Sequence, residues 1–230
     1  GGEKINMERL YTKETFKDKN FWLKARGIGG SSASAIMGAN PHMNIVELYR
    51  AIVMPNKNNV DSNKNESLFY GTRCEPILRK LFILDYKDKY RVHTPHNYEM
   101  YRRIDKPYMT ATIDGSLIEK KTKRRGILEI KTHDIRNRKD EEEWNGHLPQ
   151  NYFIQVLHYF LVLNDFEFVE VYAKLKFYDY FNPNGKKLLK SEIRTYHIER
   201  KDVMPSLKIL ENAETDFWNN NVVKKIIPTI

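Results

Sequence analysis

The sequence contains a single cysteine, Cys74, among its 230 residues. One thiol excludes an intramolecular disulfide framework. It also excludes cysteine-rich zinc and iron–sulfur sites, because each of these needs several cysteines. A protein with so little cysteine fits a reducing compartment, and we therefore expect an intracellular protein.

Long apolar runs are missing as well. No stretch approaches the ~20 apolar residues that a membrane-spanning helix needs, so no membrane partner is expected. The start, Gly-Gly-Glu-Lys-Ile-Asn, lacks the apolar core of a secretory signal. Gly1 and Gly2 are typical of a cloning scar, and residues 1–20 are expected to form an N-terminal extension.

Two common kinds of site also lack their signatures. The seven histidines contain no i, i+4 zinc pair, so we interpret them as packing or surface residues. The segment Gly27-Ile-Gly-Gly-Ser-Ser lacks the lysine of a Walker loop and the later glycine of a dinucleotide fingerprint. Its amides, with Arg26 and Ser31, remain suited to binding a phosphate.

The charge is strongly unbalanced. With 39 Lys and Arg against 30 Asp and Glu, the formal net charge is +9 and the pI is near 9.4. An anionic partner is favoured, and nucleic acid is the first candidate because neutralising phosphates releases counterions. A basic protein that is merely soluble is the alternative. A run of five basic residues lies between positions 120 and 125.

Apolar periodicity predicts a single mixed α/β domain over residues 1–230, with a sheet flanked by helices. Helices are expected over residues 16–24, from Ser32 onward, and over 46–54, 72–85, 149–163 and from 202 onward. Strands are expected over 108–113, 127–131, 169–177 and 193–198. The Asn-rich segment 55–67 is expected to be a mobile loop.

The most informative segment runs from residue 108 to 131. Its two expected strands flank the polar residues 119–125, which predicts a β-hairpin with Asp114 at the end of the first strand. The two-residue period of a strand places Glu129 and Lys131 on one face with Ile127. The opposite face, with Leu128 and Ile130, is expected to enter the core.

Two carboxylates followed by a lysine form a plausible centre for cutting a phosphodiester. Asp114 and Glu129 are expected to hold Mg²⁺, with Mn²⁺ as a substitute and the Ile130 backbone carbonyl as a third ligand. Lys131 would position or deprotonate water, or stabilise a charged transition state. In the competing interpretation Asp114-Gly115 is a turn, and Glu129 and Lys131 form a surface ion pair.

Two helices add candidate residues. Tyr152, Gln155 and Tyr159 share one face, so Gln155 and Tyr159 could hydrogen-bond phosphate or metal-bound water. Solvated polar residues on that face are the alternative. Glu75 either complements the positive end of its helix or supplies a third carboxylate near the metal.

Taken in order, these segments resemble the YqaJ-type viral recombinase and bacteriophage lambda exonuclease family of PD-(D/E)xK, RecB-like nucleases. The resemblance covers about residues 21–218. The matching motifs are Gly27-Ile-Gly-Gly-Ser, Ile36-Met-Gly-Ala-Asn-Pro, Gly71-Thr-Arg-Cys-Glu-Pro, Thr112-Ile-Asp-Gly, Leu128-Glu-Ile-Lys-Thr, the segment 149–159 and Phe217-Trp218.

The resemblance implies a restriction-endonuclease-like core and Mg²⁺-dependent digestion of linear duplex DNA, usually 5′ to 3′, for viral recombination. It makes Asp114 and Glu129 the metal carboxylates and Lys131 the catalytic lysine, with Glu75 and Gln155 as accessory residues. Binding of the terminal 5′-phosphate falls to Arg26, Ser31, Ser32, Thr112 and Tyr159, with Arg136 or Arg138 as a second arginine. Two departures are Ile113, where a proline is common, and Ser32, where an acidic residue is common.

Other expectations come from the same resemblance. The implied partners are double-stranded DNA ends, a single-strand annealing protein and further copies of the chain in a homotrimer. The implied location is the host cytoplasm, or the nucleus or viral factory for a eukaryotic virus. A structure-specific endonuclease using the same site and an inactive DNA-end-binding module are the alternative functions.

Overall fold

The computed structural model describes residues 8–55, 66–182, 184–185 and 187–229. Most of the loop predicted over 55–67, and the first seven residues of the predicted N-terminal extension, therefore lie outside the described residues. The elements in chain order are β1 (Tyr11–Thr15), α1 (Lys19–Ala25), α2 (Gly30–Ile36), α3 (Ile45–Val53), α4 (Glu66–Asp85), β2 (Tyr90–His93), β3 (Glu99–Arg103), β4 (Thr110–Ala111), β5 (Gly115–Glu119), β6 (Arg125–Ile135), α5 (Arg138–Glu143), α6 (Gln150–Val162), β7 (Phe168–Tyr178), β8 (Leu188–Glu199) and α7 (Met204–Asp216).

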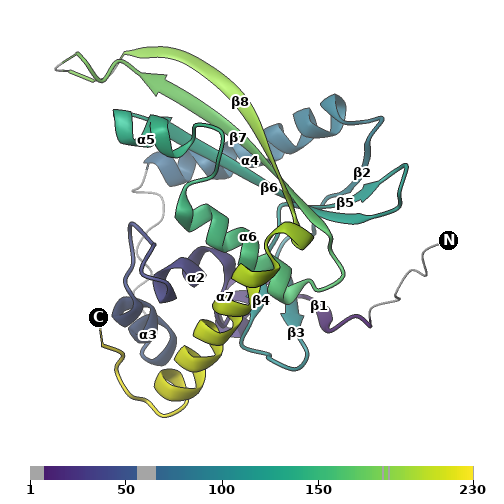
Figure 1. The fold of residues 1–230 in the computed structure, drawn as a ribbon, viewed down its shortest axis with the longest axis vertical. Helices are drawn as coiled ribbons and strands as arrows, with labels where there is room; N and C mark the ends of the chain where they lie inside the picture. The colour runs from purple at the N-terminus through teal and green to yellow at the C-terminus, as the bar shows by residue number, and fades with distance from the viewer. Residues whose placement is uncertain (1–7, 56–65, 183, 186, 230) are drawn as a thin grey trace.

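The main sheet has five strands in the order β2-β5-β6-β7-β8. The β6–β7 pair is parallel and the other pairs are antiparallel, so the sheet is mixed. A second, small antiparallel sheet has the order β1-β3-β4. Figure 1 shows α4 and α6 against the main sheet, with α7, α2 and α3 beyond α6. The predicted mixed α/β architecture with flanking helices is confirmed.

Strand β6 is buried on both faces, and its side chains alternate between two cores. Ile127 belongs to the larger core, which includes the apolar residues of α6. Leu128 and Ile130 belong to a smaller core with Leu78 and Phe82 of α4. Glu129 and Lys131 therefore point to the α6 side, where the strand period predicted them together with Ile127.

The predicted hairpin exists, but its first strand was misplaced. The strand that pairs with β6 is β5, which follows Asp114. The segment predicted as that strand contains only β4, which pairs with β3 of the small sheet. Met109 and Ala111 face the helical core instead. Asp114 therefore precedes the hairpin rather than ending its first strand.

Helix starts also differ from the prediction. Helix α1 starts at Lys19, because the Asp18 side chain accepts hydrogen bonds from the amides of Asn20 and Phe21. Helix α2 starts before Ser32: its first residue is Gly30, and Ser32 Oγ accepts the Gly29 amide at 3.1 Å. Helix α4 begins at Glu66, earlier than expected. Strands β1, β2 and β3 were not predicted.

A buried polar pair joins α6, α7 and β4. His158 is fully buried, with Nδ1 2.7 Å from Glu214 Oε1 and Nε2 2.8 Å from the Thr110 carbonyl oxygen. Buried charged groups need such partners. His158 thus has the packing role that was expected of the histidines.

Among the helices that the structure describes, none is both long and apolar enough to cross a membrane.

One carboxylate provides a test of the fold in acid. Glu199 of β8 accepts both Arg124 guanidinium nitrogens, at 2.8 and 3.0 Å, and lies 2.8 Å from His197 Nε2. These contacts, the Arg124 hydrogen bond first, lower the pKa of Glu199 to about 2 from an ordinary value of 4.5. A lowered pKa in the folded state contributes stability above the ordinary value, and that stability is lost as the pH falls toward the lowered one.

We therefore expect Glu199→Gln to destabilise the protein near pH 6 and to cost much less near pH 3. Urea unfolding at both pH values measures the difference. Glu142→Gln is the control, because Glu142 forms an exposed pair with Arg138, and such pairs contribute little. An equal cost of Glu199→Gln at both pH values would contradict the prediction.

Candidate active site

The site forms where the β5–β6 pairing stops. The last paired residues are Gly115 and Leu128. Beyond them, Asp114 Oδ2 accepts the backbone N–H of Ile130 at 2.7 Å. Because the N–H and C=O of one strand residue face the same neighbouring strand, the Ile130 carbonyl faces the same gap as Asp114. The expected metal carboxylate and the expected carbonyl ligand thus lie at one strand end.

Glu129 is almost fully buried, with 4% of its surface exposed. Its Oε1 lies 2.6 Å from Lys131 Nζ and accepts Gln155 Nε2 at 2.9 Å. Its other oxygen, Oε2, is buried and has no hydrogen-bond partner among the described residues. A buried carboxylate oxygen without a partner is costly, and a bound cation would remove that cost.

Gln155 connects the sheet to α6. Its side-chain oxygen accepts Lys131 Nζ at 2.9 Å, and its nitrogen donates to Glu129 and, at 2.7 Å, to the Tyr159 hydroxyl. That hydroxyl donates in turn to the Thr112 carbonyl oxygen at 3.0 Å. Gln155 and Tyr159 are buried, so the polar face predicted on this helix packs on the site instead of facing solvent.

The pKa values follow from this burial. Desolvation raises the pKa of Asp114 well above its usual range, and the charges of Glu129 and Glu75 raise it further, against Lys131 and the Ile130 amide. Burial acts to lower the pKa of Lys131, but the contacts with Glu129, Tyr152 and Asp114 together outweigh it, and the pKa is raised. The interpretation as a surface ion pair is wrong, because both partners of the Glu129–Lys131 pair are largely buried.

The third carboxylate, that of Glu75, forms an ion pair with an arginine of its own helix. Its Oε1 contacts Arg79 Nη2 in α4, and Arg79 Nε donates to the Asp114 backbone oxygen at 2.7 Å. Within the parts of the chain that the structure describes, no three His, Cys, Asp or Glu side chains are grouped to hold a metal. The donors that fit a metal are Asp114, Glu129 and the Ile130 carbonyl.

The residues expected to bind phosphate fall into separate places. Arg26 lies 4.6 Å from the Trp22 ring, and a Cβ built on Gly29 would fall 2.7 Å from its Nη2. Burial lowers the pKa of Arg26, with Tyr159 acting against it. In the described residues no carboxylate forms an ion pair with Arg26. Ser31 is exposed, whereas Ser32 Oγ is engaged with Gly29.

The remaining basic candidates are engaged elsewhere. Arg136 pairs with Asp134 at 2.8 Å and lies over the Tyr178 ring, and Arg138 is an exposed partner of Glu142 in α5. Neither contacts the Asp114, Glu129 and Lys131 side chains. In the basic run at the β5–β6 tip, Arg124 binds Glu119 and Glu199.

Two contacts of the site were missed from the sequence. Tyr152 was placed on the correct face, but its ring lies under Lys131, with Nζ 4.7 Å from the ring centroid. Arg79 was not considered. The only available signal was its i, i+4 spacing from Glu75, which is common on helices that have no site.

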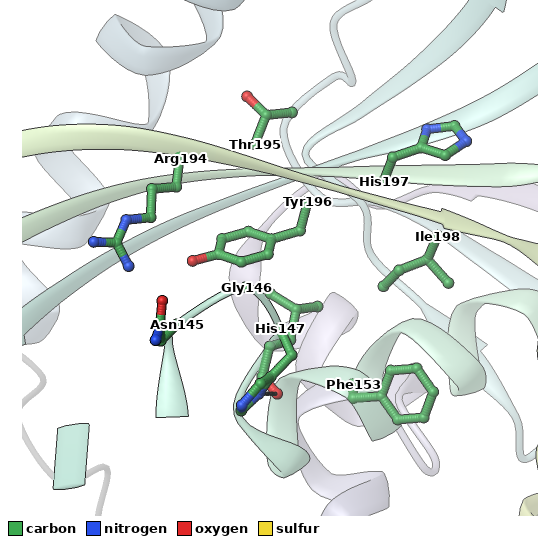
Figure 2. A pocket seen from close by; sticks show the side chains of 10 residues that line it. Asn145, Gly146, His147, Phe153, Arg194, Thr195, Tyr196, His197 and Ile198 are labelled. Atoms are coloured by element: carbon green, nitrogen blue, oxygen red, sulfur yellow. Dashed lines mark hydrogen bonds between the residues drawn. The ribbon is translucent and has the colours of Figure 1, made fainter. Parts of the chain in front are cut away.

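A groove elsewhere on the described surface does not contain this chemistry. It has a volume of about 620 Å³ and lies between β8 and the segment before α6. Figure 2 shows Arg194, Tyr196, His147 and Phe153 around it. None of Asp114, Glu129 and Lys131 lines it. We locate the site by its buried polar contacts and not by the depth of a groove.

Comparison with known proteins shows the family to which the chain belongs. The YqaJ-like viral recombinase domain matches residues 21–164, which include Asp114, Glu129, Lys131 and Gln155. The chain belongs to this family. The uncharacterized protein YqaJ of Bacillus subtilis is 27% identical to the chain over 223 residues, which are 96% of the chain. The match covers 62% of that relative's length.

Solved structures share the fold. The alkaline exonuclease LHK-Exo of Laribacter hongkongensis matches with a TM-score of 0.56 at 18% identity, over 90% of this chain and 94% of that one. LHK-Exo in complex with dAMP matches with a TM-score of 0.59 at 16% identity, over the same shares. At these identities the likeness establishes the fold of this family member.

Gly30 of α2 tests how closely the site is packed. A Cβ at this position would fall 2.7 Å from Tyr159 Cε1 and 2.9 Å from Gln155 Cγ. Both side chains are held by hydrogen bonds, so we expect Gly30→Ala to destabilise the protein by about 1–3 kcal/mol, the usual cost of overpacking.

Gly71→Ala in α4 is the matched control. Its Cβ would meet only Thr132 Oγ1, at 3.2 Å, and alanine favours a helix. Chemical denaturation of both variants measures the contrast. A Gly30→Ala protein as stable as Gly71→Ala would show that Tyr159 and Gln155 can move freely.

Proposed function

We propose that the chain is a metal-dependent deoxyribonuclease that degrades linear double-stranded DNA from its ends in the 5′ to 3′ direction. The observation that carries the proposal is the buried Glu129 beside Asp114. One of its oxygens contacts Lys131 and Gln155, and the other has no partner in the described part of the chain. Membership of the recombinase family and the net charge of +9 support DNA as the substrate. The 3′ single strands produced would serve viral recombination through an annealing protein.

Mg²⁺ is the proposed cofactor, with Mn²⁺ as a substitute. Asp114, Glu129 and the Ile130 carbonyl are oxygen donors, which these cations prefer. A bound metal would supply Lewis-acid activation of the phosphate and of the attacking water. The buried Oε2 of Glu129, which has no hydrogen-bond partner among the described residues, fits such a cation.

The surrounding side chains keep the charges in place. Gln155 holds both Glu129 and Lys131, so the carboxylate and the ammonium cannot turn independently. Lys131 places a positive charge beside the metal carboxylate. There it would stabilise the charge that develops at phosphorus, or orient and deprotonate water. The Tyr159 hydroxyl accepts a hydrogen bond from Gln155 and donates one to the Thr112 carbonyl oxygen, so it helps to fix the Gln155 side chain.

Arg26 is proposed to bind the terminal 5′-phosphate. Its guanidinium is partly buried, lies over the Trp22 ring and is next to Gly29. In the described chain it has no carboxylate partner, and a buried cation of this kind is suited to an incoming phosphate. Ser31, in the first turn of α2, is exposed.

Lys131→Ala is expected to keep duplex DNA binding and to lower Mg²⁺-dependent degradation by at least about 100-fold, since it removes a charge at the reacting centre. Degradation of a labelled linear duplex and a binding assay in Ca²⁺ measure the two properties. Lys208→Ala, at an exposed position of α7, removes the same charge elsewhere. Undiminished degradation by Lys131→Ala would refute this site.

End-labelled duplexes with and without a 5′-phosphate test the direction and the role of Arg26. We expect label to be released first from 5′ ends, faster when they carry phosphate, and Arg26→Gln to reduce that preference. Closed circular DNA is the control. Release beginning at 3′ ends, or equal cutting of circles, would instead support the opposite polarity or an endonuclease.

A further inference from the structure

Arg79 links two parts of the site that come from different elements. It lies in α4 with 13% of its side chain exposed, and its Nη2 contacts Glu75 Oε1. Its Nε donates to the backbone oxygen of Asp114 at 2.7 Å. One guanidinium therefore connects the helix carrying Glu75 to the turn carrying Asp114, 35 positions away along the chain.

These contacts differ from an ordinary pair on a helix surface. Arg138 and Glu142 have the same i, i+4 spacing, but their side chains are 84% and 65% exposed, and such pairs contribute little to stability. Arg79 is largely withdrawn from water, and its planar fork is filled from two directions. A guanidinium whose Nε and Nη2 bind two different elements restrains the geometry of both partners.

The partners of Arg79 are themselves constrained by the site. The Asp114 side chain must reach the Ile130 amide, so a shift of the Asp114 backbone would move the carboxylate away from that N–H. Glu75 lies close enough to Asp114 for its charge to raise the pKa of Asp114. Bringing like charges together is unfavourable, and the contact of the Glu75 carboxylate with the Arg79 guanidinium offsets part of that cost.

We propose that Arg79 is a positioning residue that holds Glu75 and the backbone of Asp114 in a fixed relation and thereby sets the cation affinity of the site. This inference rests on the proposed metal-dependent function. Arg79 itself touches neither metal nor substrate and acts through the residues that it contacts.

The sign of the effect separates positioning from simple electrostatics. Removing a positive charge near carboxylates would by itself strengthen cation binding. If Arg79 positions the ligands, Arg79→Gln weakens cation binding despite the lost charge. We expect about a tenfold weaker Mn²⁺ affinity. Arg79→Lys should fall between Arg79→Gln and the unsubstituted protein, because lysine keeps the charge but not the planar fork.

Mn²⁺ binding to the DNA-free protein, followed by electron paramagnetic resonance, is the test. Arg73→Gln is the matched control, since Arg73 is exposed in the same helix and lies over the Phe69 ring. The substitutions Glu75→Gln and Arg79→Gln should be non-additive when combined, because Arg79 acts in part through Glu75. Circular dichroism checks that each variant is folded.

Equal or tighter Mn²⁺ binding by folded Arg79→Gln would overturn the inference, as would full additivity with Glu75→Gln. If Arg79→Gln does not fold, Arg79→Lys decides, and an unchanged affinity of that variant overturns the inference. Asp114→Asn separates the two proposals. If it binds Mn²⁺ as tightly as the unsubstituted protein, the metal site itself is wrong and the role of Arg79 fails with it. Loss of binding in Asp114→Asn with no effect of the Arg79 substitutions refutes only the role of Arg79.

Discussion

The hydrogen bond from the Ile130 amide to the Asp114 carboxylate is the contact on which the site depends. The last backbone pair between β5 and β6 is Gly115 with Leu128. Just beyond it, the Asp114 side chain takes the place of a backbone partner for β6. A strand end normally leaves amides to water or to a turn. Here the free amide fixes a carboxylate next to Glu129, so the edge of regular structure becomes the place where two acidic groups meet.

A second constraint is that the charged groups are buried together. Glu129, Lys131 and Gln155 share hydrogen bonds on the α6 side of the sheet, and Tyr159 completes the set. Networks of this kind are stable only when nearly every member is satisfied. Oε2 of Glu129 is therefore informative, because it has no hydrogen-bond partner among the described residues while Oε1 of the same carboxylate has two. The fold tolerates that cost at the point where the proposed chemistry needs a negative charge.

Sequence periodicity correctly grouped the site residues that lie inside long strands and helices. Alternation in β6 placed Glu129 and Lys131 together, and helical spacing in α6 placed Gln155 with Tyr159. Asp114 was harder, because it lies in a connection between β4 and β5, and those strands have two and five residues. Short strands carry too few side chains for a period to show. Glu75 and Arg79 approach from α4, and only tertiary packing brings that helix to the Asp114 turn.

At Ile130 the backbone, and not the side chain, serves the site. Ile130 contributes its backbone N–H to Asp114, while its side chain packs with Leu78 and Phe82 under α4. Every amino acid except proline has that N–H. Evolution or design can therefore exchange the side chain at position 130 for another apolar one of similar size without removing the group that holds Asp114. The position is constrained by volume on one face of the sheet and by the backbone at its end.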